Sequence, residues 1–289
     1  MTESHVRARA GADERSYPPA PEPLPWPIID NHTHLEIADS ALPMSPDEHL
    51  ARAEAVGVTR IVQVGTDLAT SRWSAELAAN DQRVLAAVAL HPNEAPELAE
   101  QGVLDEHLAG IADLASQPRV RAIGETGLDF FRTEPPGRAA QTYSFEQHIA
   151  IAKAHGLALQ IHDRDAHAEV VDTLDRVGAP ELTVFHCFSG DAGLARLAVD
   201  RGWYLSFSGT VTFKNAPELR AALAVTPLDR ILIETDAPFL TPVPLRGRPN
   251  APYLLPHTLR FIASELGLTE QEAAEQFTAN TVRVYGEWS

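Results

Sequence analysis

The sequence predicts an α/β protein, a single (β/α)₈ TIM barrel with a proline-rich N-terminal leader. Short apolar runs alternate with longer helical patterns along residues 27–289, which is typical of a parallel sheet with helices outside it. There are eight such runs, and eight strands in one domain favour a closed barrel over an open sheet. The length of 289 residues also suits one barrel, which typically needs about 250.

Residues 1–26 form the leader. Prolines crowd the stretch from Tyr17 to Pro27, and proline cannot join a sheet ladder or a helix interior. The segment before Tyr17 is polar. We expect the leader to be disordered or to lie on the surface of a barrel domain that spans residues 27–289.

The expected strands are short, apolar and rich in β-branched residues. In chain order they are residues 28–30, 60–65, 84–90, 120–125, 158–162, 182–186, 204–208 and 230–236.

The expected helices begin and end at local signals. Ser45 and Glu48 form a capping box with a proline between them, and Thr269 and Glu272 form another near the C-terminus. Glycines follow several helices, where they accept left-handed backbone. The helices are expected from Ser45 to Gly57, over 69–79, 105–116 and 139–155, up to Gly178, over 191–201 and 216–224, and from Thr269 onward.

Composition narrows the class of protein. The single cysteine, Cys187, allows no intramolecular disulfide, which fits a reducing compartment. No apolar run is long enough to cross a bilayer, and the N-terminus lacks the pattern of a secretory signal. We therefore expect a cytoplasmic protein with no membrane association and no obligate protein partner. The formal net charge of −17 gives no overall attraction for nucleic acid, so bound cations and a few arginines would have to attract a phosphodiester locally.

Ionisable residues recur at the ends of the expected strands. In a barrel these ends surround one mouth, where active sites lie. The residues are His32 and His34 after the first strand, then His91, Glu125, His162, His186 and Asp236 at the ends of later strands.

Imidazole nitrogens and carboxylate oxygens suit Zn²⁺, Mn²⁺, Fe or Ni, and carboxylates also suit Mg²⁺. His32 and His34 lie two apart on an extended segment, so their side chains project to the same side and can grip one ion. His162 and His186, on adjacent strands, are expected to hold a second ion.

Two carboxylates are expected to be catalytic. Glu125 would bridge the two ions through its two oxygens, and Asp236 would bind the first ion and take a proton from a bound water. Two ions about 3.5–4 Å apart activate the water and stabilise the attacking and leaving oxygens of a displacement.

Each of these residues also has a structural explanation. A lone His-X-His is often a surface pair, and other buried histidines can be hydrogen-bonded core residues; it is the joint placement that favours ligands. For His91, contact with substrate and a role in the Pro92 turn stay equally open. The remaining histidines are expected to be solvated or structural: His5, His49, His107, His148, His155, His167 and His257.

At these residues the sequence resembles the TatD family of metal-dependent deoxyribonucleases, within the amidohydrolase-like barrels. The resemblance is collinear from residue 28 to the C-terminus and leaves out the leader. Glu36 stands where the family often has aspartate, and we expect no effect on the ligands. The matching motifs are DNHTHL at 30–35, AIGETGLD at 122–129, QIHDRDA at 160–166, HCFSG at 186–190, SGTVTFK at 208–214, ETDAPFL at 234–240 and RGRPNAP at 246–252.

The resemblance implies two divalent cations, with Mg²⁺ in use and Zn²⁺, Mn²⁺, Fe or Ni as alternatives. It also implies 3′-to-5′ exonuclease action on DNA ends, single-stranded or frayed. The metal ligands that it implies are His32, His34, Glu125, His162, His186 and Asp236, the same residues as above.

Basic residues near the mouth are the expected substrate contacts. Arg164 lies two residues after His162, so it should point into the same mouth and can hold a phosphate oxygen. A salt bridge to Asp163, Asp165 or another acidic residue at the rim is the alternative. Arg246 and Arg248 lie on a Gly/Pro-rich loop after the last strand, a kind of loop that often contacts substrate, although exposed loop arginines also often contact nothing. Lys214, after the seventh strand, is a weaker candidate of the same kind.

Two neighbours of the ligands have expected structural roles. Glu234 lies two residues before Asp236 and is expected to support the ligands from one layer deeper. Cys187 is expected to pack as a small buried side chain and not to act as a nucleophile.

Two other functions compete with the nuclease. A related barrel hydrolase would act on an amide, lactone or ester, including removal of D-amino acids from tRNA. Many such enzymes use a carbamylated lysine on the fourth strand, but that strand carries Glu125 here, and the only lysines, Lys153 and Lys214, are elsewhere. The third alternative, a metal-binding scaffold without activity, is disfavoured by the intact ligand set.

Overall fold

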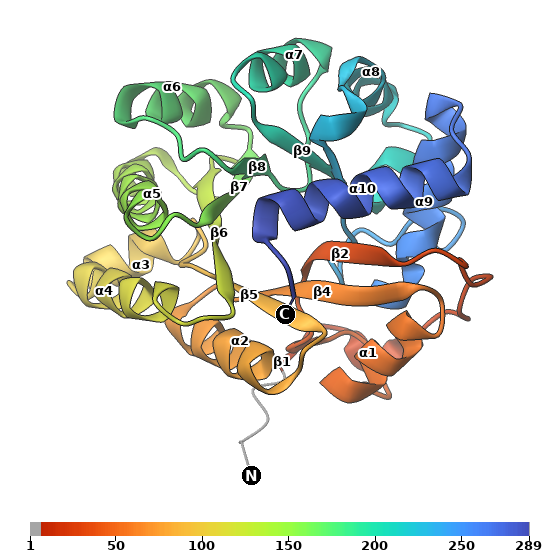
Figure 1. Ribbon diagram of the computed structural model, residues 1–289. Coiled ribbons are helices and arrows are strands. Elements are labelled where there is room, and N and C mark those ends of the chain that lie inside the picture. Colours follow the sequence, from red (N-terminus) through yellow and green to blue (C-terminus); the bar gives the residue numbers. More distant parts are fainter. Residues whose placement is uncertain (1–6, 289) are drawn as a thin grey trace.

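Eight parallel strands form a barrel in the computed structural model, which describes residues 7–288 (Figure 1). The strands follow one another around the sheet in chain order. The last strand meets the first just beyond its end, where the amide of Asp236 donates to the carbonyl of His32 at 3.0 Å and that of His34 to Ala237 at 2.8 Å. The predicted TIM barrel is therefore confirmed. The strands are β2 Ile28–Thr33, β4 Val58–Val64, β5 Val84–Val88, β6 Val120–Asp129, β7 Ala158–Arg164, β8 Thr183–Phe185, β9 Tyr204–Phe207 and β10 Ile231–Ile233.

Helices surround the barrel (Figure 1). The capping boxes expected at Ser45 and Thr269 are both formed, and Gly156 ends α5 in left-handed backbone with φ 64°. Two helices, α3 and α9, were not predicted, because each follows a proline-containing stretch that reads as loop. The helices are α1 Pro46–Glu54, α2 Leu68–Asn80, α3 Ala95–Glu100, α4 Leu104–Ala115, α5 Pro135–His155, α6 His167–Val177, α7 Ala192–Asp200, α8 Pro217–Val225, α9 Leu255–Leu266 and α10 Glu270–Tyr285.

Every strand ends one to four residues away from its predicted end, and β6, β8 and β10 are three examples near ionisable residues. β6 continues past Glu125 to Asp129, with a register shift against β7 between Ile123 and Thr126. β8 and β10 stop earlier than predicted, at Phe185 and Ile233. A short apolar run does not reveal such ends, because the pairing of each strand with its neighbours decides them.

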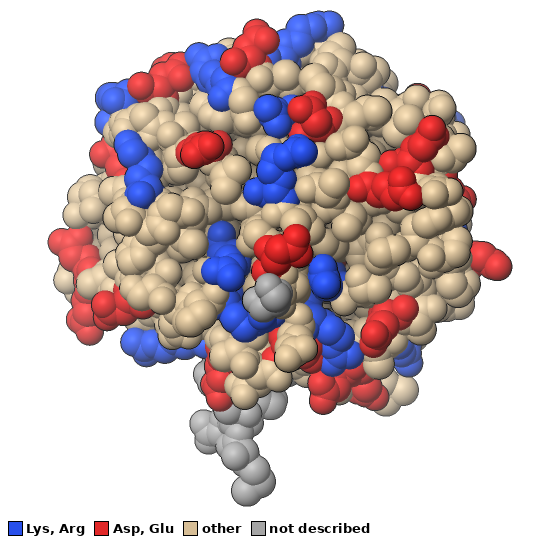
Figure 2. All heavy atoms as spheres, in the orientation of Figure 1, with Lys and Arg blue, Asp and Glu red and all other residues tan. Residues whose placement is uncertain are grey.

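Helix α10 crosses the barrel end nearest the viewer in Figure 1. Its last residues and the segment after it, Val284, Tyr285 and Trp288, are buried and pack with Ile29 and Val62 from the strands. On the outside of this end, basic and acidic side chains are mixed (Figure 2). The helix therefore closes the amino-terminal end of the barrel and leaves the carboxyl-terminal end for the site.

The leader lies against the barrel from residue 7 onward. Its strand β1, Arg7–Ala8, pairs in parallel with β3, Ile37–Ala38, which follows β2. A 3₁₀ turn, η1, covers Ala12–Glu14, and Leu24 farther along is buried. Its prolines thus join no ladder, and the pairing occurs in the polar segment before them.

Between residues 7 and 288, no helix combines the length and the apolar character that a membrane crossing requires.

Candidate metal centre

The predicted ligands gather at one end of the barrel, although they come from five strands. His32 lies in β2 and His34 directly after it, whereas Glu125 and His162 lie within β6 and β7. His186 and Asp236 follow the ends of β8 and β10. Three groups have ligand atoms within 4.8 Å of one another: His32, His186 and Asp236; His32, His34 and Glu125; and His91, Glu125 and His162.

The two histidines of the first motif face each other. Their Nε2 atoms lie 3.2 Å apart, and Nδ1 of His34 is 3.0 Å from the carbonyl oxygen of Val64. If Nδ1 of His34 donates to that carbonyl, its Nε2 carries a lone pair that points toward His32. Oδ1 of Asp236 is 3.5 Å from Nε2 of His34 and 3.8 Å from Nε2 of His32.

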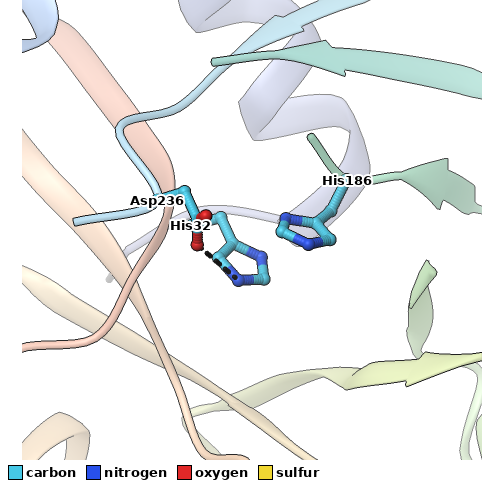
Figure 3. Close-up of side chains that lie close together, drawn as sticks. All are labelled: His32, His186 and Asp236. Carbon is cyan, nitrogen blue, oxygen red and sulfur yellow. Dashed lines mark ion pairs between the residues drawn. The ribbon is translucent and has the colours of Figure 1, made fainter. Parts of the chain in front are cut away.

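Figure 3 shows how His186 completes this side of the centre. Its ring stacks on that of His32, with the centroids 3.8 Å apart, while Asp236 approaches His32 from the other side. Three segments that are distant in the sequence therefore meet here because the barrel closes between β2 and β10.

Glu125 stands between two sets of histidines. Its Oε2 lies 3.7 Å from Nε2 of His32 and 3.7 Å from Nε2 of His34. Its Oε1 lies 2.5 Å from Nδ1 of His162 and 2.9 Å from Nε2 of His186. The two carboxylate oxygens thus face different sets, which is the arrangement that a bridging ligand requires.

These side chains fit divalent cations. Nδ1 of His32 is buried and has no hydrogen-bond partner within residues 7–288. Nitrogen lone pairs and carboxylate oxygens converge in a buried space, and this donor set suits transition metals and, through its carboxylates, Mg²⁺. Where imidazole nitrogens face each other at 3.2 Å, a cation satisfies both of them.

The charges of the centre are strongly coupled. Burial opposes a charge on His34, but Asp236 and Glu36 outweigh it and raise the pKa of His34 to about 9. Burial would also raise the pKa of Glu125, but His186 and His91 hold it well below its ordinary value. Without a cation, protons on the histidines must supply the positive charge beside these carboxylates. A bound metal ion would take the place of those protons.

Glu234 supports the centre from behind, as expected. It is fully buried, and its Oε1 accepts hydrogen bonds from Nδ1 of His186 at 3.1 Å and from the amide of Cys187 at 2.8 Å. Its Oε2 accepts the hydroxyl of Ser206 at 2.5 Å. A carboxylate on the far nitrogen fixes the orientation of the imidazole, which leaves Nε2 of His186 facing Glu125.

Sequence reasoning missed Asp129. Its Oδ2 lies 3.3 Å from Nε2 of His162 and accepts from the side chain of Asn93 at 3.2 Å. Burial opposes the charge of Asp129, but His162 and the amide of Arg132 hold its pKa far below the ordinary value. The signal was present, because Glu125 and Asp129 lie four apart and therefore share a face of one extended strand.

His91 contacts two of the predicted ligands as well as the turn that follows it. Its Nε2 is 3.4 Å from Oε1 of Glu125, and its ring meets that of His162 edge to face. Its Nδ1 also accepts the amide of Asn93 at 3.1 Å. His91 therefore shapes the turn and faces the centre, and its contact with substrate stays a prediction.

The backbone is unusual where the ligands approach one another. Asp236 and Cys187 adopt left-handed conformations, with φ of 53° and 41°. Such backbone is uncommon outside glycine and tends to occur at functional sites. Gly127 has φ 141°, and a Cβ there would lie 2.1 Å from the carbonyl oxygen of His162, so only glycine lets β6 approach β7 this closely.

A cavity of about 720 Å³ opens above the centre. Of the predicted substrate contacts, His91 and Arg164 line it, and Arg164 stacks over the ring of Phe131 at 3.9 Å. Within the described residues, Arg164 forms no ion pair with Asp163 or Asp165.

The structure does not bring the other three predicted contacts to this cavity. Lys214 is exposed elsewhere, and Arg246 stacks over Phe213 at 4.0 Å. Arg248 donates to Ser16 and to the carbonyl of Tyr17, so it fastens the leader to the loop after β10. These pairings are long-range, which is why spacing along the chain did not reveal them.

The histidines expected to be solvated or structural are placed accordingly where the structure describes them. His148 is buried, with Nε2 accepting the amide of Leu90 at 3.0 Å and Nδ1 2.7 Å from the carbonyl of Ser144. His49 is buried beside Tyr17, and His155 is exposed at the end of α5. His5 lies outside the described residues.

Comparison with known proteins identifies the family of the chain. The family model described as "TatD related DNase" matches residues 29–286. The chain belongs to the TatD-related DNase family. A curated relative, the "Uncharacterized metal-dependent hydrolase TatD" of Mycobacterium tuberculosis, is 43% identical over 266 residues, covering 90% of this chain and 98% of the relative. The "3'-5' ssDNA/RNA exonuclease TatD" of Cronobacter turicensis is 36% identical over 261 residues, covering 87% and 95%.

The fold of this TatD-family chain also matches solved structures. The crystal structure of YJJV, a TatD homologue from Escherichia coli K12, superposes with a TM-score of 0.81 at 29% identity, covering 89% of this chain and 97% of that one. The resemblance seen in the sequence is confirmed, and the protein is a metal-dependent hydrolase of the TatD family.

Proposed function

We propose that the protein is a 3′-to-5′ exonuclease that hydrolyses phosphodiester bonds at single-stranded or frayed DNA ends. Two divalent cations would assist it, with Mg²⁺ in use. The observation that carries the proposal is the position of Glu125, whose two carboxylate oxygens face two different sets of histidines. The name of the Cronobacter relative, a 3′-5′ ssDNA/RNA exonuclease, supports the direction and the substrate class.

Six side chains would hold the cations. The set combines four imidazoles with two carboxylates, as two-cation hydrolytic sites commonly do. When bound, the cations would lower the pKa of water and offset negative charge on the attacking and leaving oxygens. The ligands are His32, His34, Glu125, His162, His186 and Asp236.

The remaining steps belong to the protein. Both carboxylates line the cavity, but Asp236 is the proposed proton acceptor because its side chain is the more exposed, at 12% against 7% for Glu125, which histidines surround. Glu234 holds the ring of His186 in place. Arg164 lines the cavity and can donate two hydrogen bonds to a phosphate.

The competing amide, lactone or ester hydrolase gains no specific support. The barrel wall carries Glu125 where the lysine-bridged enzymes have lysine. Lys153 lies on α5, where its Nζ donates to the carbonyl of Val177 at 2.9 Å, and Lys214 is exposed away from the cavity.

Glu125→Gln tests the proposal. Wild type should shorten a single-stranded oligonucleotide labelled at its 5′ end one nucleotide at a time with Mg²⁺, Mn²⁺ or Zn²⁺ added to chelated protein. The variant keeps the shape of the side chain but loses the charge between the two sets of histidines, and we expect a rate loss of about 10³-fold or more. Glu169→Gln on exposed α6 is the matched control and should retain the wild-type rate.

Two results would contradict the proposal. One is a Glu125→Gln variant that digests DNA at the wild-type rate. The other is a metal-loaded wild type that leaves DNA ends intact but hydrolyses aminoacyl esters or lactones.

A further inference from the structure

The leader brings two arginines to the mouth of the cavity. Its strand β1 is fixed by backbone hydrogen bonds, from Arg7 to the carbonyl of Glu36 at 2.7 Å and from Arg9 to that of Ala38 at 2.8 Å. Arg7 and Arg9 alternate with Ala8 on this extended segment, and all three line the cavity of about 720 Å³ above the metal centre. They precede the residues that match the family model, which begins at 29.

Contacts within the described residues hold Arg9 in position, but they leave hydrogen-bond donors of its guanidinium group available. Its guanidinium stacks over the ring of Phe239, with Cζ 4.8 Å from the centroid, and Nη1 lies 3.0 Å from Oδ2 of Asp39. Within residues 7–288, only Nη1 of Arg9 donates a side-chain hydrogen bond. Asp39 also has a second partner, because Arg15 lies 3.0 Å from its other oxygen. The need to neutralise the buried carboxylate of Asp39 therefore does not by itself explain why Arg9 is present.

Arg7 is similarly placed. Its guanidinium lies 3.5 Å from Glu36 and 3.5 Å from Asp67, donates to the hydroxyl of Thr66 at 3.3 Å, and remains 48% exposed. Glu36 has another partner, the side-chain amide of Gln63 at 2.7 Å. Contacts at 3.5 Å by an exposed arginine contribute little to stability, so a structural role explains Arg7 poorly.

The leader supplies half of the arginines at this site. Among the described residues, four arginines line the cavity, and Arg132 and Arg164 come from other elements, after β6 and at the end of β7. The chain has a net charge of −17, so an approaching polyanion depends on these local cations. On the face closed by α10, basic and acidic side chains are mixed (Figure 2).

We infer that Arg7 and Arg9 bind backbone phosphates of the single strand whose 3′ end enters the metal centre. The inference rests on the proposed function. The two side chains are specificity-determining contacts to nucleotides away from the reacting bond, and the leader is thereby part of the substrate-binding surface. Guanidinium groups that keep free donors beside an open cavity suit phosphate oxygens.

The test compares Arg7→Gln/Arg9→Gln with wild type. In the metal-loaded enzyme, KM for a single-stranded oligonucleotide should rise roughly tenfold at low salt, while kcat stays within about twofold. The slope of log(kcat/KM) against log salt should fall by about 1.4, since each phosphate contact to a single strand contributes about 0.7. Hydrolysis of bis(p-nitrophenyl) phosphate should not change, because that ester has no further backbone phosphates for Arg7 and Arg9 to bind.

Three controls separate direct contact from docking of the leader. Arg7→Lys/Arg9→Lys keeps the charges and should restore most of the salt slope. Arg196→Gln removes an exposed arginine on α7 and should leave KM unchanged. Fluorescence anisotropy with the labelled oligonucleotide and the Glu125→Gln variant measures binding without turnover, and the two leader substitutions should weaken that binding by a similar factor.

The outcomes are distinct. If wild type cleaves DNA but Arg7→Gln/Arg9→Gln keeps its KM and salt slope, the inference is wrong and the proposed function stands. A variant with higher kcat/KM would also overturn it, because the leader would then obstruct the cavity. If wild type neither binds nor cleaves the oligonucleotide, the proposed function fails and the inference fails with it.

Discussion

The two ends of the barrel are built in opposite ways. At the amino-terminal end, Val284, Tyr285 and Trp288 bury their side chains among apolar residues of the strands. At the carboxyl-terminal end, imidazoles and carboxylates are buried within a few ångströms of one another. One end therefore gains stability from apolar burial, whereas the other concentrates polar groups that are costly to bury without a compensating charge.

A thin layer of hydrogen bonds separates the two ends. The hydroxyl of Tyr285 donates to Asn31 at 3.0 Å and accepts from the side chain of Gln160 at 2.7 Å. Asn31 and Gln160 each lie within two residues of a predicted ligand, His32 and His162. The comparison teaches that the closed end supplies the rigidity that holds the ligands in place, while the chemistry depends on the open end.

Removing the metal should have the largest effect and should act on the open end only. Chelation should reduce DNA hydrolysis by at least about 10³-fold. Adding Mn²⁺ back at about 100 times its dissociation constant should stabilise the fold by about 2.7 kcal/mol, or raise Tm by roughly 5 °C.

Thermal unfolding of chelated protein with and without Mn²⁺ measures this shift. The double variant His32→Ala/His34→Ala should show little of it, whereas the exposed His155→Ala control should show all of it. An equal Tm shift in wild type and in both variants would mean that Mn²⁺ binds at another site. The contrast between the two ends of the barrel would then not hold.

Trp288→Ala should have the next largest effect, on the closed end. Trp288 is 3% exposed, and removing a buried aromatic side chain costs about 3–5 kcal/mol, toward the low end near a chain terminus. Denaturant unfolding measures the loss, and Leu42→Ala, at a residue that is 81% exposed, is the control. At a temperature where the variant is folded, its kcat should stay within about twofold of wild type; a large loss of kcat would mean that the two ends are not separable.

The smallest effect near neutral pH concerns a buried histidine outside both ends. Burial lowers the pKa of His148 to about 4, although the carbonyl of Ser144 opposes the shift. The unfolded chain, with a pKa near 6.5, therefore takes up this proton first as the pH falls. Stability from His148 is complete above pH 6.5 and falls by about 1.4 kcal/mol per pH unit between 6.5 and about 4.

His148→Gln should lose this contribution to the acid slope, measured as the free energy of unfolding at several pH values. His49 contributes in the same direction, because burial lowers its pKa to about 4 as well, so part of the slope should remain. The exposed His155→Gln control should match wild type. An unchanged slope in His148→Gln would mean that His148 is not held neutral, and the contrast between structural and metal-site histidines would weaken.

Much of the architecture could be predicted because its signals are local. The capping boxes at Ser45 and Thr269 act within one turn of helix, and both are formed. The strands were predicted from short apolar runs, and their order around the barrel follows from the rule that parallel strands with helical crossovers wind one way. Since active sites lie where strands end, the ligands could also be named before their geometry was known.

What the sequence alone determined is the eight barrel strands, most of the helices around them and the kinds of side chain at the strand ends, because periodicity and caps depend on residues a few positions apart. What only the tertiary structure decided is which of those side chains meet. Asp129 joined the centre because β6 continues past Glu125, and Arg9 reached the cavity because β1 pairs with β3. Arg248 turned to the leader instead of the cavity for the same kind of reason: its partners, Ser16 and Tyr17, lie more than two hundred residues away, and only the closed barrel brings them together.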